Sequence, residues 1–335
     1  MTTEAKIQLT STELGTIWMT YQSTTASILL FDLMKEQTID KEAQSILSDY
    51  VTECQGIKDK LVNILNNENA VIPIAFNESD IIRAAPPLFD DFFNIMFLRQ
   101  MMKLNFGNAG IASAMSYMKE VNDVFKLNYD VSNNYFMRTT NYLLGKGVLP
   151  RPPYATIPTK VEFIEDKNYM SGFNLFSEKR ALNTVEVGYI NESIQSNIVG
   201  MQLMTAFAQA AKEVEVKKYF IEGKELAKKT ITDLRDILLQ SDIQPPSAWA
   251  GKATNSTIPP FTDKLMMFIT SLLSSAGIGY TAMGTSFSMR SDLHLKFAAI
   301  AKGIFDFSVT GGKIMIKHRW MEELPQMEDR NQLTK

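Results

Sequence analysis

The two histidines of this 335-residue chain are the side chains best suited to chemistry, and a di-iron centre is the chemistry they could serve. A helical bundle that holds two iron ions takes a Glu from each of two helices and a Glu-x-x-His motif from each of the other two. His294 and His318 do not complete this motif, because Ser291 and Met315 stand three residues before them. On one continuous helix the two histidines would lie about 36 Å apart, too far to share a metal. The sequence therefore predicts no metal centre and no cofactor, and a site made of carboxylates alone is the alternative.

Other candidates for chemistry have structural explanations. Thr310-Gly311-Gly312-Lys313 looks like part of a phosphate loop, but it lacks the P-loop spacing and falls inside a predicted helix. Cys54 is the only cysteine, and we expect it to be buried as a small apolar side chain. A single cysteine excludes an intramolecular disulfide and favours a reducing, cytoplasmic compartment.

Acidic residues recur at predicted helix starts, where a carboxylate can cap backbone N–H groups and offset the helix dipole. Glu13 and Glu186 have capping-box spacing to a Thr and an Asn three residues earlier. Asp90 and Asp263 stand at the start of later helices. We expect all four to be structural, so the sequence predicts no catalytic residue.

A fixed offset of 173 positions relates the two halves of the chain. Matching pairs include Leu9/Leu182, Glu13/Glu186, Gly15/Gly188, Gln22/Gln195, Leu61/Leu234, Pro73/Pro246, Pro86/Pro259, Pro87/Pro260 and Asp90/Asp263. The apparent starts of the last helix, Asn122-Asp123 and Ser291-Asp292, differ by 169 instead, which predicts one extra helical turn in the first copy. The chain is therefore a duplication.

Each copy is predicted to form four helices. The first helices are expected at 10–35 and 184–212, and the second carry apolar residues every three or four positions with charges between them. A loop of about 17 to 20 residues follows, longer than the usual connection in bundles, which favours one long crossover. The predicted fold class is all-α, a duplicated ferritin-like four-helix bundle with a long helix 2 to helix 3 crossover in each copy.

The positions of proline predict the domain limits, and the balance of charges excludes some partners. We expect an N-terminal tail at 1–9, a first bundle at 10–149, a Pro-rich linker at 150–181, a second bundle at 182–324 and a C-terminal tail at 325–335. With 34 basic and 37 acidic residues, the chain has no charge excess for nucleic acid or an anionic membrane. The start of the chain also lacks the apolar segment of a secretory signal.

Three stretches of the second half resemble a known family: PPSAWAGKATNSTIPPFTDKLMMF, SSAGIGYTAMGTSFSMRSDLHLKFA and GGKIMIKHRWME. They are similar to the bacterial family called domain of unknown function 3231, seen mostly in spore-forming relatives of Bacillus, and the resemblance covers nearly the whole chain. It implies tandem ferritin-like bundles and, through a looser similarity to coat-F-type proteins, a link to sporulation. It carries no catalytic residues. The first copy lacks counterparts of Trp320 and of the Gly311-Gly312 pair, so a function kept in one copy is expected in the second.

Three predicted helical stretches carry no charge on any side: 14–31, 193–211 and 265–289. The last has 25 residues, enough to cross a bilayer, but it holds eight Ser or Thr and three Gly, so we predict no membrane span. Faces without charge must be covered. The other copy is the nearest cover, and a symmetric homodimer would extend it.

Candidate packing and interface residues are Gly277, Gly279, Gly284, Trp249 and Trp320. Glycines allow two backbones to approach closely, so we expect these to face the other copy. On that basis Gly279→Leu should destabilise the protein by about 1 to 3 kcal/mol through overpacking.

Two classes of function fit these observations. The first is a non-catalytic structural or interaction protein that binds itself or a protein partner, in a sporulation or spore-coat setting. The alternative is a helical bundle that binds a small molecule or lipid-like ligand in an apolar pocket between helices. A cavity with convergent polar groups would favour binding, whereas a filled core with a wide exposed apolar patch would favour assembly.

Overall fold

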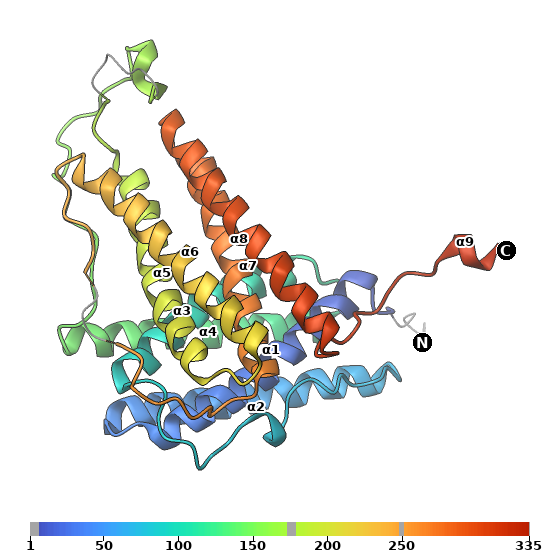
Figure 1. Ribbon diagram of the computed structural model, residues 1–335. Coiled ribbons are helices and arrows are strands. Elements are labelled where there is room, and N and C mark those ends of the chain that lie inside the picture. Colours follow the sequence, from blue (N-terminus) through green and yellow to red (C-terminus); the bar gives the residue numbers. More distant parts are fainter. Residues whose placement is uncertain (1–6, 173–178, 248–250, 335) are drawn as a thin grey trace.

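Figure 1 shows the computed structural model, which describes residues 7–172, 179–247 and 251–334. Eight long helices form most of it, four from each half of the chain. They are α1 (Ser11–Gln37), α2 (Lys41–Asn67), α3 (Asp91–Ala114), α4 (Lys119–Gly145), α5 (Thr184–Ala210), α6 (Val214–Leu239), α7 (Asp263–Phe287) and α8 (Ser291–Lys317). The shorter elements of the described ranges are two 3-10 turns, η1 (Glu78–Asp80) and η2 (Lys167–Met170), and the C-terminal turn α9 (Arg330–Leu333). The predicted all-α, duplicated four-helix bundle is confirmed.

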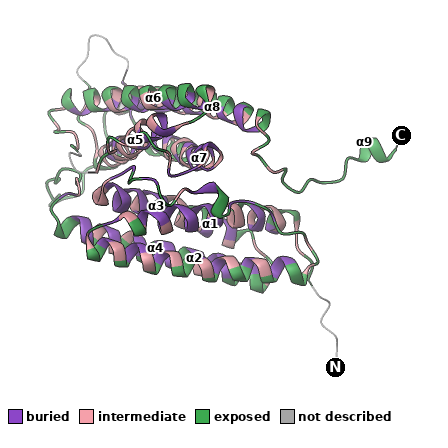
Figure 2. Ribbon diagram, turned by 60° about the horizontal axis from the view of Figure 1, so that its bottom comes forward, coloured by how far each residue is buried: buried purple, intermediate pink, exposed green. Residues whose placement is uncertain are grey.

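The two bundles are stacked face to face, as Figure 2 shows. α2 and α4 form one outer layer, and α1 and α3 lie inside it. α5 and α7 form the next layer, and α6 and α8 form the other outer layer. The outer helix α2 is one-sided: it buries Ile46, Leu61 and Leu65 and turns its charged residues to solvent. The helices with long uncharged stretches, α1, α5 and α7, all lie in the two inner layers.

One hydrophobic core joins the two bundles. The ring centroids of Phe89 and Phe207 are 6.2 Å apart, and those of Phe76 and Phe268 are 4.7 Å apart. The shared part of the core comes mostly from the C-terminal halves of α1 and α5 and the N-terminal halves of α3 and α7. The prediction that uncharged helices face the other copy is confirmed for these halves. Beyond them the bundles cross and diverge (Figure 1).

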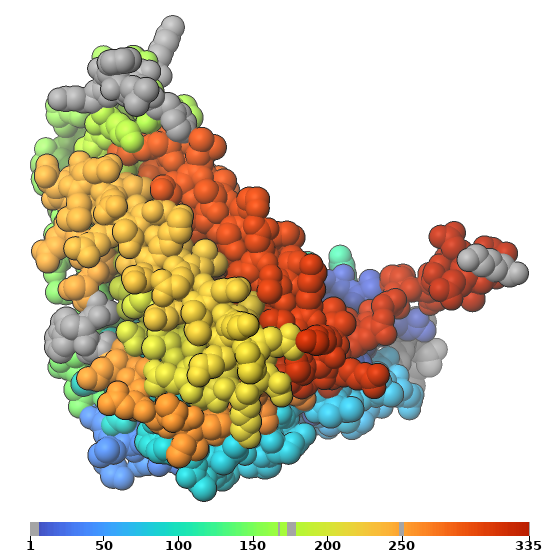
Figure 3. Space-filling model, in the orientation of Figure 1, coloured from blue at the N-terminus to red at the C-terminus, as the bar shows by residue number. Residues whose placement is uncertain are grey.

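The two long crossovers, 68–90 and the described residues 240–247 and 251–262, pair with each other and lie in contact near the bottom of Figure 3. Backbone hydrogen bonds of 2.8 to 3.1 Å join them at two places. The N–H donors and their carbonyl acceptors are Ile82 to Pro260 and Thr262 to Asp80 at one place, and Thr254 to Leu88 and Asp90 to Lys252 at the other. The second pair of bonds joins the positions that correspond to those of the first pair, 172 residues later in the first crossover and 172 residues earlier in the second. The pairing therefore follows the twofold symmetry of the duplication.

The predicted extra turn in the first copy is wrong. α4 and α8 both have 27 residues, and their first residues, Lys119 and Ser291, differ by 172. The sequence placed the start of α4 at Asn122-Asp123, but the side-chain amide of Asn122 donates to a carbonyl at the end of α3 (2.8 Å). The N-cap is Met118, whose N–H is bound by a carboxylate of another helix. No local sequence pattern indicates such a contact.

By length and composition alone, α7 is apolar enough to cross a membrane. Among the helices of the described residues, it is the one that meets this test. Core helices of soluble proteins meet it as well, and 44% of the most apolar window of α7 is buried here. The expectation of no membrane span stays a prediction.

The three candidate glycines of α7 do not pack against the first bundle. A Cβ at Gly284 would lie 3.0 Å from the ring of Phe297, and a Cβ at Gly277 would lie 3.1 Å from Ile304. Both neighbours belong to α8 of the same bundle. Gly279 is exposed, and a Cβ there would meet nothing within 4 Å. The expectation that Gly279→Leu overpacks a contact between copies is therefore wrong, because the C-terminal half of α7 extends beyond the first bundle (Figure 1).

We expect Gly284→Ala to lower the free energy of unfolding by about 1 to 3 kcal/mol, because the fully buried Phe297 has no room to move. Gly279→Ala should raise it by about 0.5 to 1 kcal/mol, since Ala has the higher helix propensity and its methyl group meets open space. Urea unfolding followed by circular dichroism compares both variants with the wild type. An equal loss of stability in the two variants would contradict these packing assignments.

Candidate functional site

A buried carboxylate in the first turn of α1 joins the N-termini of two helices. Glu13 is fully buried, and its Oε2 accepts bonds from the N–H and the hydroxyl of Thr10, the N-cap of α1, at 2.9 and 2.8 Å. Its Oε1 accepts the N–H groups of Tyr117 and Met118, both at 2.7 Å, where α4 begins. Burial by itself would raise the pKa of Glu13, but these bonds outweigh burial and lower the pKa. The carboxylate thus satisfies N–H groups that have no partner within their own helices.

The second copy repeats this arrangement and adds an arginine. Glu186 Oε1 accepts the N–H groups of Met289 and Arg290 at 3.0 Å each, and Oε2 accepts that of Asn183 at 2.9 Å. The guanidinium of Arg180 donates to both oxygens, at 2.7 and 2.8 Å. Burial would raise the pKa of Glu186, but the bonds from Arg180 and the three N–H groups lower it to about 2.

A second pair of carboxylates joins the N-termini of helices 2 and 3 in each copy. Asp91 accepts two backbone N–H groups at the start of α2, at 3.0 and 2.8 Å. Asp263 accepts the two equivalent groups at the start of α6, at 3.1 and 2.7 Å. The predicted pairing of Asp90 with Asp263 is wrong by one residue, because the offset between copies is 172 here. Asp90 is instead the N-cap of α3 and corresponds to Thr262, the N-cap of α7.

Glu13, Asp91, Glu186 and Asp263, which we call the tie carboxylates, each bind two N–H groups of a second helix. The lowered pKa values make Glu13 and Glu186 weak bases, because protonation would break the bonds that stabilise each anion. The geometry therefore assigns them a structural role. Among the residues that the structure describes, no group of three or more His, Cys, Asp or Glu side chains is arranged to hold a metal ion.

The two histidines lie near opposite ends of α8, where the sequence placed them. His294 is in the first turn, and its buried Nε2 has no hydrogen-bond partner within the described residues. His318 is the C-cap, and its Nε2 lies 2.6 Å from an oxygen of Glu215. Its ring stacks on Trp320, with centroids 4.3 Å apart, and Trp320 packs against the shared core. Trp249, the other tryptophan among the candidate residues, lies outside the described residues.

The single cysteine is buried, as the sequence predicted. Cys54 faces the core from α2 with 3% of its surface exposed. Burial raises the pKa of its thiol to about 12, so the reactive thiolate does not form near neutral pH.

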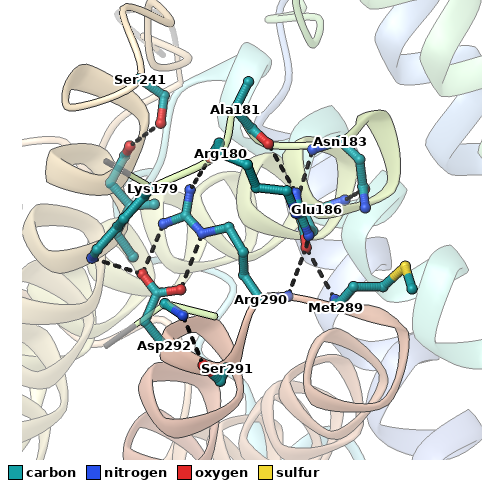
Figure 4. A network of polar contacts seen from close by, with 12 residues as sticks. Lys179, Arg180, Ala181, Asn183, Glu186, Ser241, Met289, Arg290, Ser291 and Asp292 are labelled. Atoms are coloured by element: carbon teal, nitrogen blue, oxygen red, sulfur yellow. Dashed lines mark hydrogen bonds and ion pairs between the residues drawn. The ribbon is translucent and has the colours of Figure 1, made fainter. Parts of the chain in front are cut away.

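Figure 4 shows a polar network that holds the linker against the far end of the second bundle. The buried guanidinium of Arg290 donates to both oxygens of Asp292, at 3.0 and 2.7 Å, and to the carbonyl of Arg180 at 3.1 Å. Lys179 forms an ion pair with Asp292 at 2.9 Å. Gly172 lies so close that a Cβ there would be 2.7 Å from the backbone nitrogen of Asp292. The charges of this network are paired with one another. We therefore assign the network a structural role, which is to hold residues 172, 179 and 180 of the linker against the start of α8.

Sequence reasoning missed three members of these arrangements: Asp91, Arg180 and Arg290. Asp91 has a signal, because it precedes Asp263 by 172 positions and would be found if the offset could change within the crossover. The two arginines have none, since their partners are set by where the linker returns to the bundle.

The fold and these ties define a protein made of two equivalent four-helix bundles. The chain belongs to the family described as protein of unknown function (DUF3231), which matches residues 1–161 and 170–333. The two matches correspond to the two copies, and they confirm the resemblance seen in the sequence. A crystal structure of a candidate spore coat protein from Bacillus halodurans C-125 is similar over 45% of this chain and 98% of that chain, with 18% identity and a TM-score of 0.42. No curated protein matches the chain.

We expect Glu186→Gln to destabilise the protein at pH 7 by about 3 kcal/mol. This is the stability that the Glu186 anion contributes because folding lowers its pKa from 4.5 to about 2. This contribution is fully present above pH 4.5 and is lost as the pH falls towards 2. The difference between variant and wild type should therefore shrink over that interval. Urea midpoints measured from pH 7 down to pH 3 check this, with Glu222→Gln, an exposed glutamate of α6, as the control. A difference that stayed constant with pH would rule out the charge as its source.

Proposed function

We propose that the protein is a non-catalytic structural protein that assembles with further copies of itself through the free parts of its inner helices. The observation that carries this proposal is an apolar surface that occurs twice, once at the end of each copy. Its members are exposed at equivalent positions, although large apolar side chains normally avoid solvent when they cluster.

The two surfaces, which we call the end patches, lie at the C-terminal end of the third helix in each copy and in the residues just after it. The first comprises Ile111 (59% exposed), Met115 (40%) and Tyr117 (74%), and the second comprises Met283 (51%), Phe287 (57%) and Met289 (37%). An offset of 172 relates each member to its counterpart. No charged residue occurs between Leu104 and Met118 or between Leu265 and Met289. Within these two stretches, therefore, no like-charged groups oppose contact between two such patches.

The occupant we propose for an end patch is the end patch of another copy. α3 and α7 already pack between the two bundles in their N-terminal halves, and the end patches continue these helices beyond the covered part. The chemistry of the exposed half matches that of the half that is buried against the other copy. Because each chain carries two patches, such contacts would produce an open-ended assembly rather than a closed dimer.

Further features of the chain suggest which part of it assembles and in which cell this assembly takes place. We propose that the bundles at 10–149 and 182–324 act as one rigid unit, because they share a core. The near balance of 34 basic and 37 acidic residues supports a protein partner rather than nucleic acid or a membrane. The sequence resemblance to coat-F-type proteins suggests the sporulating cell as the setting, with the single buried cysteine fitting a cytoplasmic origin. Detection of the protein in purified spores of its host would test that setting.

Size-exclusion chromatography with light scattering tests the assembly over a range of concentrations. We expect the wild type to grow beyond dimers as the concentration rises. Phe287→Glu should stop growth at dimers, because one patch remains, and Met115→Glu with Phe287→Glu should leave monomers. Phe305→Glu is the matched control, since Phe305 is also 57% exposed but lies on the outer helix α8.

Two results would refute the proposal. One is a wild type that stays monomeric at every concentration. The other is an effect of Phe305→Glu as large as that of Phe287→Glu, which would mean that any added charge disperses the protein.

A further inference from the structure

A cleft between the two bundles brings together charged residues that have no charged counterparts at the equivalent positions of the other copy. It is bounded by α3, α4 and the N-terminal part of α5, and residues 149–152, where the first bundle passes into the linker, cover one side. Its volume is about 310 Å³, within the range of about 300 to 1,000 Å³ of small-molecule sites. Apolar walls are provided by Phe136, Leu144, Leu149 and Pro150.

The cleft holds more positive than negative charge. Lys103, 10% exposed, binds both oxygens of Glu192 at 2.5 and 2.6 Å, so these two charges offset each other. Arg99 has no such partner: its Nε donates to the hydroxyl of Thr140 at 2.8 Å, and its guanidinium lies 4.7 Å from the centroid of Phe136. Within the described residues no carboxylate oxygen lies within 4.0 Å of it. Burial lowers the pKa of Arg99, and the charge of Glu192, which is bound to Lys103, opposes this shift without cancelling it.

The duplication shows that the same arrangement of helices forms without these charges. The tie carboxylates occur in both copies, as do the glutamines that reach the segment after the last helix, Gln22 and Gln195. The positions equivalent to Arg99 and Lys103 are Ser271 and Ser275, and the position equivalent to Glu192 is Met19. The twofold-related place on the molecule therefore folds without these charges.

We propose that the cleft binds a small anionic amphiphile, with its carboxylate or phosphate head on Arg99 and its apolar body against Phe136 and Leu149. A guanidinium presents two parallel N–H donors that match either head group, and this pairing is stronger than a bond to a neutral hydroxyl. An incoming anion would supply the direct ion pair that Arg99 lacks. This inference is independent of the proposed assembly, because the cleft lies between the bundles and the end patches lie beyond them.

Isothermal titration calorimetry with octanoate and octyl phosphate tests the site, with octan-1-ol and inorganic phosphate as controls for body and head alone. We expect one or both amphiphiles to bind at least tenfold more tightly than either control, and the stronger of the two identifies the head group. Arg99→Gln should weaken that binding about tenfold or more, which is about 1.4 kcal/mol. Arg138→Gln is the control, because Arg138 also lies over an aromatic ring but pairs with Asp49 on the outer layer.

A second variant tests the cleft without removing charge. Gly188 lines the cleft from α5, and a Cβ there would meet nothing within 4 Å, so Gly188→Leu should fill the space and abolish binding. The variant should also unfold at a higher temperature, because a glycine inside a helix is replaced. Its matched control is Gly15→Leu, the equivalent position of α1, where a Cβ also meets open space. Failure of both amphiphiles to bind, or unchanged affinity in either Arg99→Gln or Gly188→Leu, would overturn the proposal.

Discussion

Hydrogen bonds from helix N-termini to the tie carboxylates hold each bundle together at both ends. Adjacent helices are antiparallel, and the long crossover returns the chain to the end where helix 2 began, so helices 2 and 3 start together, as do helices 1 and 4. Each end therefore places two N-termini across the diagonal of the bundle, each with unpaired N–H groups and a partial positive charge. One carboxylate satisfies groups of both helices and supplies the opposite charge. The topology creates four such places, and the chain has an Asp or Glu at each.

The parts of this design that rest on neighbouring residues could be predicted from the sequence. The capping boxes at Glu13 and Glu186, the one-sided pattern of α2 and the two copies all depend on short spacings or on a constant offset. The N–H groups of the second helix that each tie carboxylate binds could not be predicted. Those bound by Glu13, for example, lie 104 and 105 residues further along the chain. For the same reason the predicted start of α4 at Asn122-Asp123 is wrong.

The stretches without charge predicted burial but not the partner that provides it. A pattern along one helix fixes which residues avoid water, whereas the crossing of the bundles decides how much of each helix is covered. Gly284 and Gly279 illustrate the difference, because five residues separate a position packed against Phe297 from one that faces open space. The same crossing leaves the end patches exposed at equivalent positions of both copies, where assembly with a further chain would cover them.

The duplication also separates the residues that maintain the fold from those that have another task. Both copies fold to the same helices, and the tie carboxylates occur at equivalent positions of both. Arg180 and Arg290 occur in the second copy alone, but each has a carboxylate partner within the fold. The positions equivalent to Arg99, Lys103 and Glu192 hold Ser271, Ser275 and Met19. The helices around those positions nevertheless follow in the same order. A partly buried guanidinium without an anionic partner costs stability, because its lost hydration is not replaced. A residue that is both unnecessary for the fold and unfavourable to it is best explained by a ligand that completes its charge.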